Sequence, residues 1–502
     1  MGSVVVGLER SSVVGWMRMW VRQDKRAILQ RLKEGGPIQT IAPQGNGALE
    51  ELVALSIELG TFEMLDSLVV KRQREGIPDS LLLRTLSVLP FLVDGSLDAT
   101  AEGLFAEPAI LLELGYAPVA LREGVSHRHR RPEGKTEQSV PIHPDTLRDE
   151  LARLTEDDWI SLQERRLEAL YSRRLIRSKK VVIDGSGLGD GMRLVTLSAL
   201  TGDGLVPLAF AFLTGDASEK GKEAAVTRQL VERVRKIGGE GAIELLIADA
   251  LYADGPLLAW LQSKGIVGLV RLPEDCLLCG EALSIIKLEG DQWRERRQTR
   301  VLNGHKQTRK VEVACVGQLT DWDSYIAKAQ ELGIAEPGLF VTLVRQLEPA
   351  VPKDKELLAL VSTQQWPDGW QAYEAYRPRW WQENAGFNEL KEGWLLERYP
   401  WGRSEAIVRG RVGFTLLAQQ VVALYRQAAG RRLAGHGIRR LRRALCRRFG
   451  SPALVVVVED RYAVVTAEEL VAALGRPVRE SLRCILSPPP QATRKITGTE
   501  SN

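Results

Sequence analysis

The stretch between Lys179 and Leu272 constrains the fold more than any other part of the sequence, because strand-sized apolar runs alternate there with helical patterns. The apolar runs, in chain order, are Val181–Ile183, Leu194–Leu200, Leu205–Leu213, Glu244–Ala248 and Ile266–Leu272. The second and third runs are joined by Thr-Gly-Asp-Gly, which is typical of a hairpin. Helical patterns over residues 219–236 and 256–263 separate the last three runs. This order predicts an α/β domain in which an antiparallel meander is followed by strands with crossover helices.

The rest of the 502-residue chain predicts further domains around this core, which we assign to residues 177–272. Residues 1–170 predict a helical region, whose short helices at 80–115 fit either a helix-turn-helix-like DNA-binding module or an ordinary bundle. Residues 273–371 hold strand-like pieces and turns, which predict an inserted, mostly β subdomain. Residues 372–430 return to helical patterns, the first of which predicts one long helix from Glu374 to about Leu396. Residues 431–502 predict a basic region with a disordered tail.

Composition excludes several classes of protein. Hydrophobic residues make up 44% of the chain and charged residues 26%, which is ordinary usage for a folded globular protein. No apolar run approaches the ~18 residues of a membrane span, and residues 16–20 are too polar for a signal-peptide core. The sequence therefore predicts a cytoplasmic protein with no membrane partner.

The five cysteines are too few and too scattered for a disulfide framework. Cys276 and Cys279 form one C-x-x-C pair, but a zinc site of that type needs a second pair of ligands. Only Cys315 and His305 lie nearby, at irregular spacing. We interpret the cysteines as small hydrophobic residues.

Basic residues gather in two places, although the net charge is only +4. One cluster is His127–Arg131, and the other is an arginine-rich C-terminal segment. The arginines of that segment are Arg426, Arg431, Arg432, Arg439, Arg440, Arg442, Arg443, Arg447 and Arg448. Such clusters suit polyanions, because each arginine neutralises a phosphate and releases counterions. A solvated helix face is the alternative for either cluster alone, but two clusters together favour a nucleic-acid partner.

Three carboxylates stand at positions that suggest chemistry. Asp184 and Asp249 each end an apolar strand, and that edge of an α/β sheet is where functional sites form. Glu383 lies on a helix after the insertion. If the three converge, cations must offset their repulsion, and oxygen ligands suit Mg²⁺ or Mn²⁺. A pair of such ions can activate an attacking oxygen and stabilise the leaving oxygen of a phosphodiester.

The helix that carries Glu383 has a distinctive face. Tyr376, Arg379, Glu383 and Phe387 follow one another in steps of three and four, which puts them on one side of an ideal helix. The whole segment reads Tyr-Arg-Pro-Arg-Trp-Trp-Gln-Glu-Asn-Ala-Gly-Phe-Asn-Glu-Leu-Lys, from Tyr376 to Lys391.

This segment resembles the Tyr-Arg-Glu-Lys signature of insertion-sequence DDE transposases. The resemblance covers about residues 177–430 and implies a ribonuclease-H-like mixed sheet flanked by helices. It also implies a β insertion between the second Asp and the Glu, and it agrees with a helical N-terminal domain that binds the ends of the element. The order of elements predicted above matches that arrangement, including the position of the insertion.

By the same resemblance, Asp184, Asp249 and Glu383 are the catalytic metal ligands, and two Mg²⁺ or Mn²⁺ ions are the cofactor. Tyr376 and Arg379 would contact DNA at the cleaved end, Tyr376 by stacking or through a phosphate. The partners implied are double-stranded DNA, as element ends and as target, and a second copy of the chain in a paired-end complex. The protein would then be associated with a bacterial nucleoid.

Lys391 would hold a phosphate of the element end, although it departs from the signature by one position. The signature has its Lys seven residues after the Glu, where this chain has Leu390. On an ideal helix one extra residue rotates Lys391 by about 100°, which a local bulge or the long side chain would correct. Further phosphate contacts are expected from the basic C-terminal region, at Arg439, Arg440, Arg442 and Arg443.

Three other functions are alternatives to a transposase. The glycine-rich run Gly185–Gly191 predicts a loop after the first strand, but a dinucleotide site there is disfavoured, because the glycine spacing is wrong and a strand follows. No Walker-A sequence is present either, so we expect no nucleotide cofactor. A DNA-binding protein of transposase descent that no longer cuts, and a nuclease of the same fold without strand transfer, both stay open.

Overall fold

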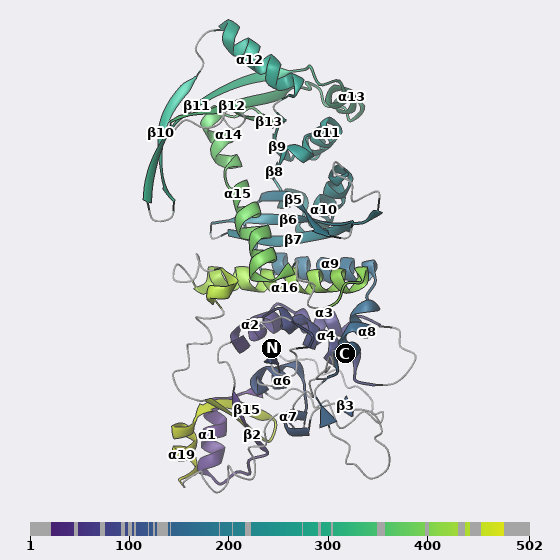
Figure 1. Cartoon of the computed structure of the whole chain (residues 1–502), viewed down its shortest axis with the longest axis vertical. Coiled ribbons are helices and arrows are strands. Elements are labelled where there is room, and N and C mark those ends of the chain that lie inside the picture. Colours follow the sequence, from purple (N-terminus) through teal and green to yellow (C-terminus); the bar gives the residue numbers. More distant parts are fainter. Residues whose placement is uncertain are drawn as a thin grey trace, which may run out of the picture. The chain divides into compact units, whose positions relative to one another are not determined.

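The structure is a computed structural model of a mixed α/β protein (Figure 1). It describes residues 22–44, 49–70, 76–91, 96–98, 103–104, 107–118, 120–123, 126–127, 139–140, 142–189, 191–202, 204–215, 222–273, 275–289, 293–302, 305–348, 357–396, 401–429, 437–441 and 453–475. The chain divides into two compact units. Unit 1 combines residues 1–166 with residues 390–502, and unit 2 is residues 167–389.

Unit 2 is built on one nine-stranded sheet with the strand order β10-β11-β12-β13-β9-β8-β5-β6-β7. The strands that precede the insertion are β5 (Lys180–Gly189), β6 (Met192–Thr201), β7 (Gly204–Leu213), β8 (Leu245–Ala248) and β9 (Val267–Arg271). The first three pair in antiparallel fashion, whereas β8 runs parallel to both β5 and β9. This confirms the predicted meander and the crossover connections.

The strand β5 is longer than the sequence predicts. The apolar run ends at Asp184, and we expected the glycine-rich residues beyond it to form a loop. Instead Gly185–Gly189 continue the ladder against the start of β6, where Gly187 pairs with Arg193. Glycine is a poor strand former, but here the neighbouring strand supplies backbone hydrogen bonds that a sequence pattern does not reveal. Asp184 therefore lies inside a strand, at the place where its parallel neighbour β8 stops.

The insertion extends the main sheet. Its strands are β10 (Arg294–Leu302), β11 (His305–Leu319), β12 (Leu339–Glu348) and β13 (Leu357–Ser362), and β13 pairs with β9 in antiparallel fashion. The long β10–β11 ribbon is visible in Figure 1. Its helices are α12 (Leu277–Glu289), which the sequence analysis missed, and α13 (Asp323–Glu331). The α12 helix packs on β11 and β12, and it contains the buried Cys279 and neighbours Cys276, both free thiols.

Helices cover both faces of the core sheet in unit 2. On one side, α10 (Glu223–Gly238) packs on β6 and β7, and α11 (Gly255–Ser263) packs on β9. Short 3-10 turns precede and follow β8, η3 (Glu240–Ala242) and η4 (Ala250–Tyr252). On the other side, α14 (Gly369–Tyr376) packs on β9, β11 and β12. Its Tyr376 joins a buried cluster with Val182, Ile247 and Leu269.

The predicted continuous helix from Glu374 to about Leu396 is interrupted. It consists of α14, α15 (Arg379–Trp381) and two π-helical segments, η6 (Gln382–Phe387) and η7 (Glu389–Gly393). Pro378 stands at the junction of α14 and α15, where proline removes a backbone donor. A π turn holds one more residue than an α turn and often marks a functional site. The single α-helical face predicted for Tyr376, Arg379, Glu383 and Phe387 from steps of three and four therefore does not hold.

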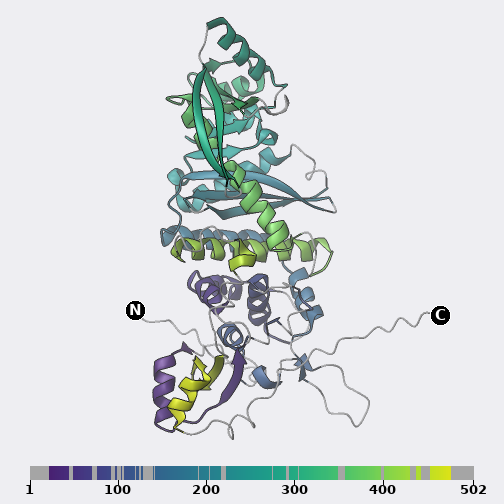
Figure 2. The ribbon, with the colours of Figure 1, turned by 60° about the vertical axis from the view of Figure 1, so that its left-hand side comes forward.

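Unit 1 joins the two ends of the described chain in one four-stranded sheet, ordered β1-β15-β14-β2. Its strands are β1 (Arg22–Gln23), β2 (Thr40–Gln44), β14 (Ala453–Val458) and β15 (Arg461–Thr466). The helices α1 (Lys25–Lys33) and α19 (Ala467–Leu474) lie side by side on this sheet (Figure 2). Ile28, Val456 and Leu470 form part of the core between them. The N-terminal region is thus not purely helical, and the C-terminal region contains an ordered sheet.

The remaining helices of unit 1 form a bundle. They are α2 (Leu49–Glu58), α3 (Thr61–Asp66), α4 (Asp79–Val88), η1 (Leu89–Phe91), α6 (Pro108–Leu114), α7 (Ala120–Glu123), α8 (Pro144–Ala152), α9 (Glu156–Ser172, which continues into unit 2) and α16 (Glu405–Ala429). A small ribbon of β3 (Ser126–His127) and β4 (Ser139–Val140) completes the described elements. In α4 every residue from Leu81 to Val88 is buried, which leaves no face for a DNA groove and favours the bundle interpretation.

Of the described helices, α16 alone is long and apolar enough to span a membrane. The most apolar window of that helix is 89% buried inside the protein, and this burial accounts for its composition. Trp159 on α9 packs edge-on against Phe414 in the middle of α16, with ring centroids 5.1 Å apart. A Cβ at Gly413 would lie 2.4 Å from the same indole, so the close approach of the two helices requires glycine there.

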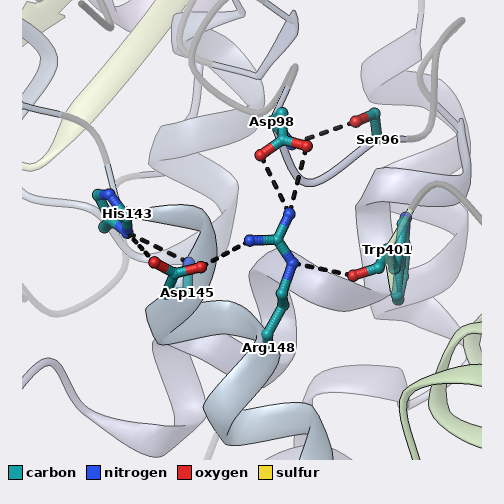
Figure 3. Close-up of polar contacts among 6 residues, drawn as sticks. All are labelled: Ser96, Asp98, His143, Asp145, Arg148 and Trp401. Carbon is teal, nitrogen blue, oxygen red and sulfur yellow. Dashed lines mark hydrogen bonds and ion pairs between the residues drawn. The ribbon is translucent and has the colours of Figure 1, made fainter. Parts of the chain in front are cut away.

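A half-buried arginine ties separate segments of unit 1 together (Figure 3). Arg148 on α8 donates to Asp145 at 2.6 Å, to Asp98 at 3.0 Å and to the backbone carbonyl of Trp401 at 3.0 Å. His143 caps the same helix, since its Nδ1 accepts from the Asp145 amide at 3.2 Å. Three segments that are far apart in the sequence therefore meet at one guanidinium.

Candidate active site

The parallel pairing of β5 with β8 brings Asp184 and Asp249 to the same level of the sheet. Val182 is in register with Ile247, and each aspartate follows two residues later, Asp184 within β5 and Asp249 just past the end of β8. Neighbouring strands lie about 4.8 Å apart, and residues two apart share a face. Both carboxylates therefore belong to the face that α14 covers, as Val182 and Ile247 do. The two aspartates selected from the sequence come together as predicted.

Arg379 joins the two aspartates. Its Nη1 lies 3.5 Å from Asp184 Oδ2 and 3.9 Å from Asp249 Oδ2. The side chains of Arg379 and Asp184 are each 13% exposed, and that of Asp249 is 31% exposed. Asp184 Oδ1 also accepts a hydrogen bond from the backbone amide of Gly185 at 2.8 Å. The site thus holds one guanidinium against two carboxylates in a largely dehydrated environment.

The segment that carries Glu383 is anchored beside Asp184. Gln382 is buried, and its Nε2 donates to Thr196 Oγ1 at 2.7 Å. Thr196 is the direct partner of Asp184 in the β5–β6 ladder. The backbone of η6 therefore runs past the strand that bears the first aspartate. The side chain of Glu383 lies outside the described residues.

Tyr376 belongs to the core of unit 2. It is only 6% exposed, and Arg379 lies over its ring at 5.8 Å from the centroid. Burial raises the pKa of its hydroxyl, and the positive charge of Arg379 opposes that rise. The Tyr376 ring therefore packs against the guanidinium of Arg379. Stacking on a base would require the ring to leave the core, and the hydroxyl oxygen is buried as well.

A second layer of polar groups lies beneath Gly185. Glu223 is fully buried at the start of α10, and its Oε1 is 3.0 Å from Arg193 Nε on β6. A Cβ at Gly185 would lie 3.3 Å from Arg193 Nε and 3.4 Å from Tyr252 Oη, which explains the glycine. The pKa of Tyr252 is raised well above its usual value by burial and then by the charge of Asp184. Sequence patterns missed these residues, because only folding brings them together.

The residues present fit a divalent cation. Asp249 Oδ1 is buried and has no hydrogen-bond partner among the described residues, which is costly unless a donor or a cation satisfies it. Carboxylate oxygens are ligands that Mg²⁺ and Mn²⁺ prefer. Within the described part of the chain no group of three or more His, Cys, Asp or Glu side chains is spaced as metal ligands. Of the three predicted metal ligands, the structure describes the side chains of Asp184 and Asp249.

The other predicted DNA contacts lie in unit 1. Lys391 is on η7 and half-buried, while Arg439 and Arg440 are exposed. Arg439 donates through Nη2 to the backbone carbonyl of Glu392. Arg442 and Arg443 fall outside the described residues, as do Arg431, Arg432, Arg447 and Arg448 of the same cluster. In unit 2 the sequence analysis passed over Trp380, whose indole is 56% exposed directly beside Arg379.

No protein-family model matches the sequence, and no curated protein matches it either.

Proposed function

We propose that the protein is a DNA transposase of the DDE type, with a ribonuclease-H-like catalytic domain in unit 2. It cleaves phosphodiester bonds at the ends of its mobile element and joins the 3′-hydroxyl ends to target DNA. The observation that carries the proposal is the register of β5 and β8, which sets Asp184 opposite Asp249 with Arg379 between them.

The topology of unit 2 supports the fold part of the proposal. Three antiparallel strands are followed by two parallel strands, and the first strand lies in the middle of the five. A β insertion then separates Asp249 from the segment of Glu383. This is the arrangement that the resemblance to insertion-sequence transposases implies. The π turns at η6 and η7 supply the kind of bulge that an extra residue before Lys391 requires.

Asp184, Asp249 and Glu383 would hold the Mg²⁺ or Mn²⁺ ions. These ions supply Lewis-acid activation of the attacking oxygen and charge stabilisation of the leaving one. Arg379 binds a phosphate beside the scissile bond, since a guanidinium suits two-point contact with phosphate oxygens. The ring of Tyr376 packs against the Arg379 guanidinium and helps to position it. Trp380 is exposed, and an unstacked base would stack on its indole. The chain positions DNA and stabilises charge, and no covalent protein–DNA intermediate is needed.

The test is a reaction with DNA that carries the two sequences flanking the chain's own coding gene. Purified protein is incubated with end-labelled flanking DNA, a supercoiled target plasmid and Mg²⁺ or Mn²⁺. The proposal expects nicks at the element boundary and labelled joints in the plasmid. Cuts without joints would support a nuclease of the same fold, and binding without cuts a protein of transposase descent that has lost catalysis.

A further inference from the structure

Arg379 lies where a divalent cation bound by both Asp184 and Asp249 would lie. A single nitrogen, Nη1, faces one carboxylate oxygen from Asp184 and one from Asp249, at 3.5 and 3.9 Å. A guanidinium carries its charge at every physiological pH. In the DNA-free protein the carboxylate pair is therefore already partly neutralised by a cation of the chain itself.

Both of these contacts of Arg379 with the aspartates are long. Direct N–H···O hydrogen bonds span about 2.7–3.2 Å, and both separations are longer than that. The attraction to the aspartates is thus mainly electrostatic, without the tight geometry of a structural ion pair. A cation held in this way is replaceable by a stronger one, and a divalent ion with direct carboxylate bonds is stronger.

We propose that Arg379 is an internal counter-ion that occupies the cation position of the Asp184–Asp249 pair until DNA binds. A phosphate of the DNA end then draws the guanidinium out and opens the pair to a divalent ion. The exchange keeps charges paired, since the phosphate gains the guanidinium while the aspartates gain the metal ion. This inference rests on the proposed function and adds an order to it, in which DNA engagement precedes tight metal loading.

Two consequences follow from this exchange. Without DNA, Arg379 competes with the metal ion, so removing its charge strengthens metal binding. With DNA, metal and phosphate support each other, and by linkage each raises the affinity of the other by the same factor. A merely structural role of Arg379 predicts neither effect, because loss of a structural contact loosens the site and weakens metal binding.

The experiment measures Mn²⁺ binding by electron paramagnetic resonance, with full-length protein and no DNA. Arg379→Ala is compared with wild type and with Arg377→Ala, which removes an exposed arginine two residues earlier. We expect Mn²⁺ to bind about tenfold more tightly to Arg379→Ala, the scale of losing one like charge near 4 Å. Arg377→Ala should match wild type. Equal or weaker Mn²⁺ binding by Arg379→Ala would overturn the inference.

A second measurement needs no variant. Wild-type protein is titrated with Mn²⁺ in the presence and absence of a duplex that carries the flanking end sequence. The inference expects the duplex to tighten Mn²⁺ binding at least several-fold, and an unchanged affinity overturns it. Different results would reject the counter-ion role of Arg379 and the transposase function. Tighter Mn²⁺ binding by Arg379→Ala without any DNA cleavage by wild type would reject the transposase and keep the counter-ion.

Discussion

Two arginines of this protein each lie between two aspartates, and they differ in the lengths of their contacts with those aspartates. Arg148 in unit 1 bonds to Asp98 and Asp145 at 3.0 and 2.6 Å and also to a backbone carbonyl (Figure 3). Arg379 in unit 2 stands 3.5 and 3.9 Å from its aspartates. The first arrangement fixes the bundle. If Arg379 is the internal counter-ion proposed above, the second arrangement keeps its charge available for exchange with a metal ion.

The surroundings of the aspartates explain the difference. Asp98 and Asp145 are 69% and 67% exposed, so water solvates them with or without Arg148. Asp184 and Asp249 are 13% and 31% exposed, and Asp249 has a buried oxygen with no partner among the described residues. A carboxylate pair that is partly shielded from water needs a cation more than an exposed pair does. The comparison therefore separates an arginine that bridges exposed carboxylates from one that bridges carboxylates partly shielded from water.

The largest effect should come from the aspartates of unit 2. Asp184→Asn or Asp249→Asn should lower DNA-end cleavage by about 10³-fold or more, because the metal ligands supply several kcal/mol of charge stabilisation. Binding of end DNA, measured by mobility shift, should change little. Asp98→Asn is the matched control and should cut like wild type. Comparable loss of cutting in all three variants would erase the distinction between the two regions.

Gly185 tests the layer beneath the site. Gly185→Ala would place a methyl group 3.3 Å from Arg193 Nε and 3.4 Å from Tyr252 Oη, which should shift Asp184 by a few tenths of an ångström. We expect about a tenfold loss of cleavage rate, since small misplacements of catalytic groups are costly. Gly187→Ala has open space around its Cβ and serves as the control. Single-turnover cleavage rates measure both, and equal rates would mean that the layer has no positioning role.

Arg148 should affect stability and leave chemistry alone. Arg148→Ala removes two exposed ion pairs and the donor to the Trp401 carbonyl, which should lower the free energy of unfolding by about 1–2 kcal/mol. Urea denaturation followed by tryptophan fluorescence gives this value. Mn²⁺ affinity and the cleavage rate of the folded variant should match wild type. A change in Mn²⁺ affinity would contradict the assignment of Arg148 as purely structural.

The smallest effect concerns pH and Tyr252. Burial, with a contribution from Asp184, raises the pKa of its hydroxyl above the unfolded value of 10.0. The protonated form is therefore favoured in the folded state, and its contribution is complete below pH 10 and declines as pH rises above it. Tyr252→Phe keeps the ring and should lose less stability between about pH 10 and pH 11 than wild type. Parallel losses in urea midpoints over that interval would show that the hydroxyl is not buried among charges.

Local patterns in the sequence were enough to predict the core strands and the meeting of the aspartates. Apolar runs of strand length marked β5 to β9, and acidic residues that follow such runs must meet where parallel strands align. Other features depend on partners far away in the chain. The pairing of β1 with β15 joins residues about as distant as this chain allows, and neither strand has a pattern that identifies the other.

The layer of Arg193, Glu223 and Tyr252 shows the same limit within the site. Each residue is unremarkable in its own segment, and the three lie on β6, α10 and η4. Their proximity follows from packing around Gly185, which no spacing rule encodes. The interruption of the Glu383 helix was likewise not predicted, although Pro378 was a local sign of it.

The central claim is that Asp184 and Asp249 together bind a divalent cation at the position now held by Arg379. Anomalous X-ray scattering from crystals of the full-length protein bound to a duplex with the flanking end sequence, and soaked in Mn²⁺, tests it most directly. The account predicts a manganese peak bonded to both carboxylates, with the guanidinium of Arg379 moved away from them. Arg379 still lying between two manganese-free aspartates at saturating Mn²⁺ would contradict it.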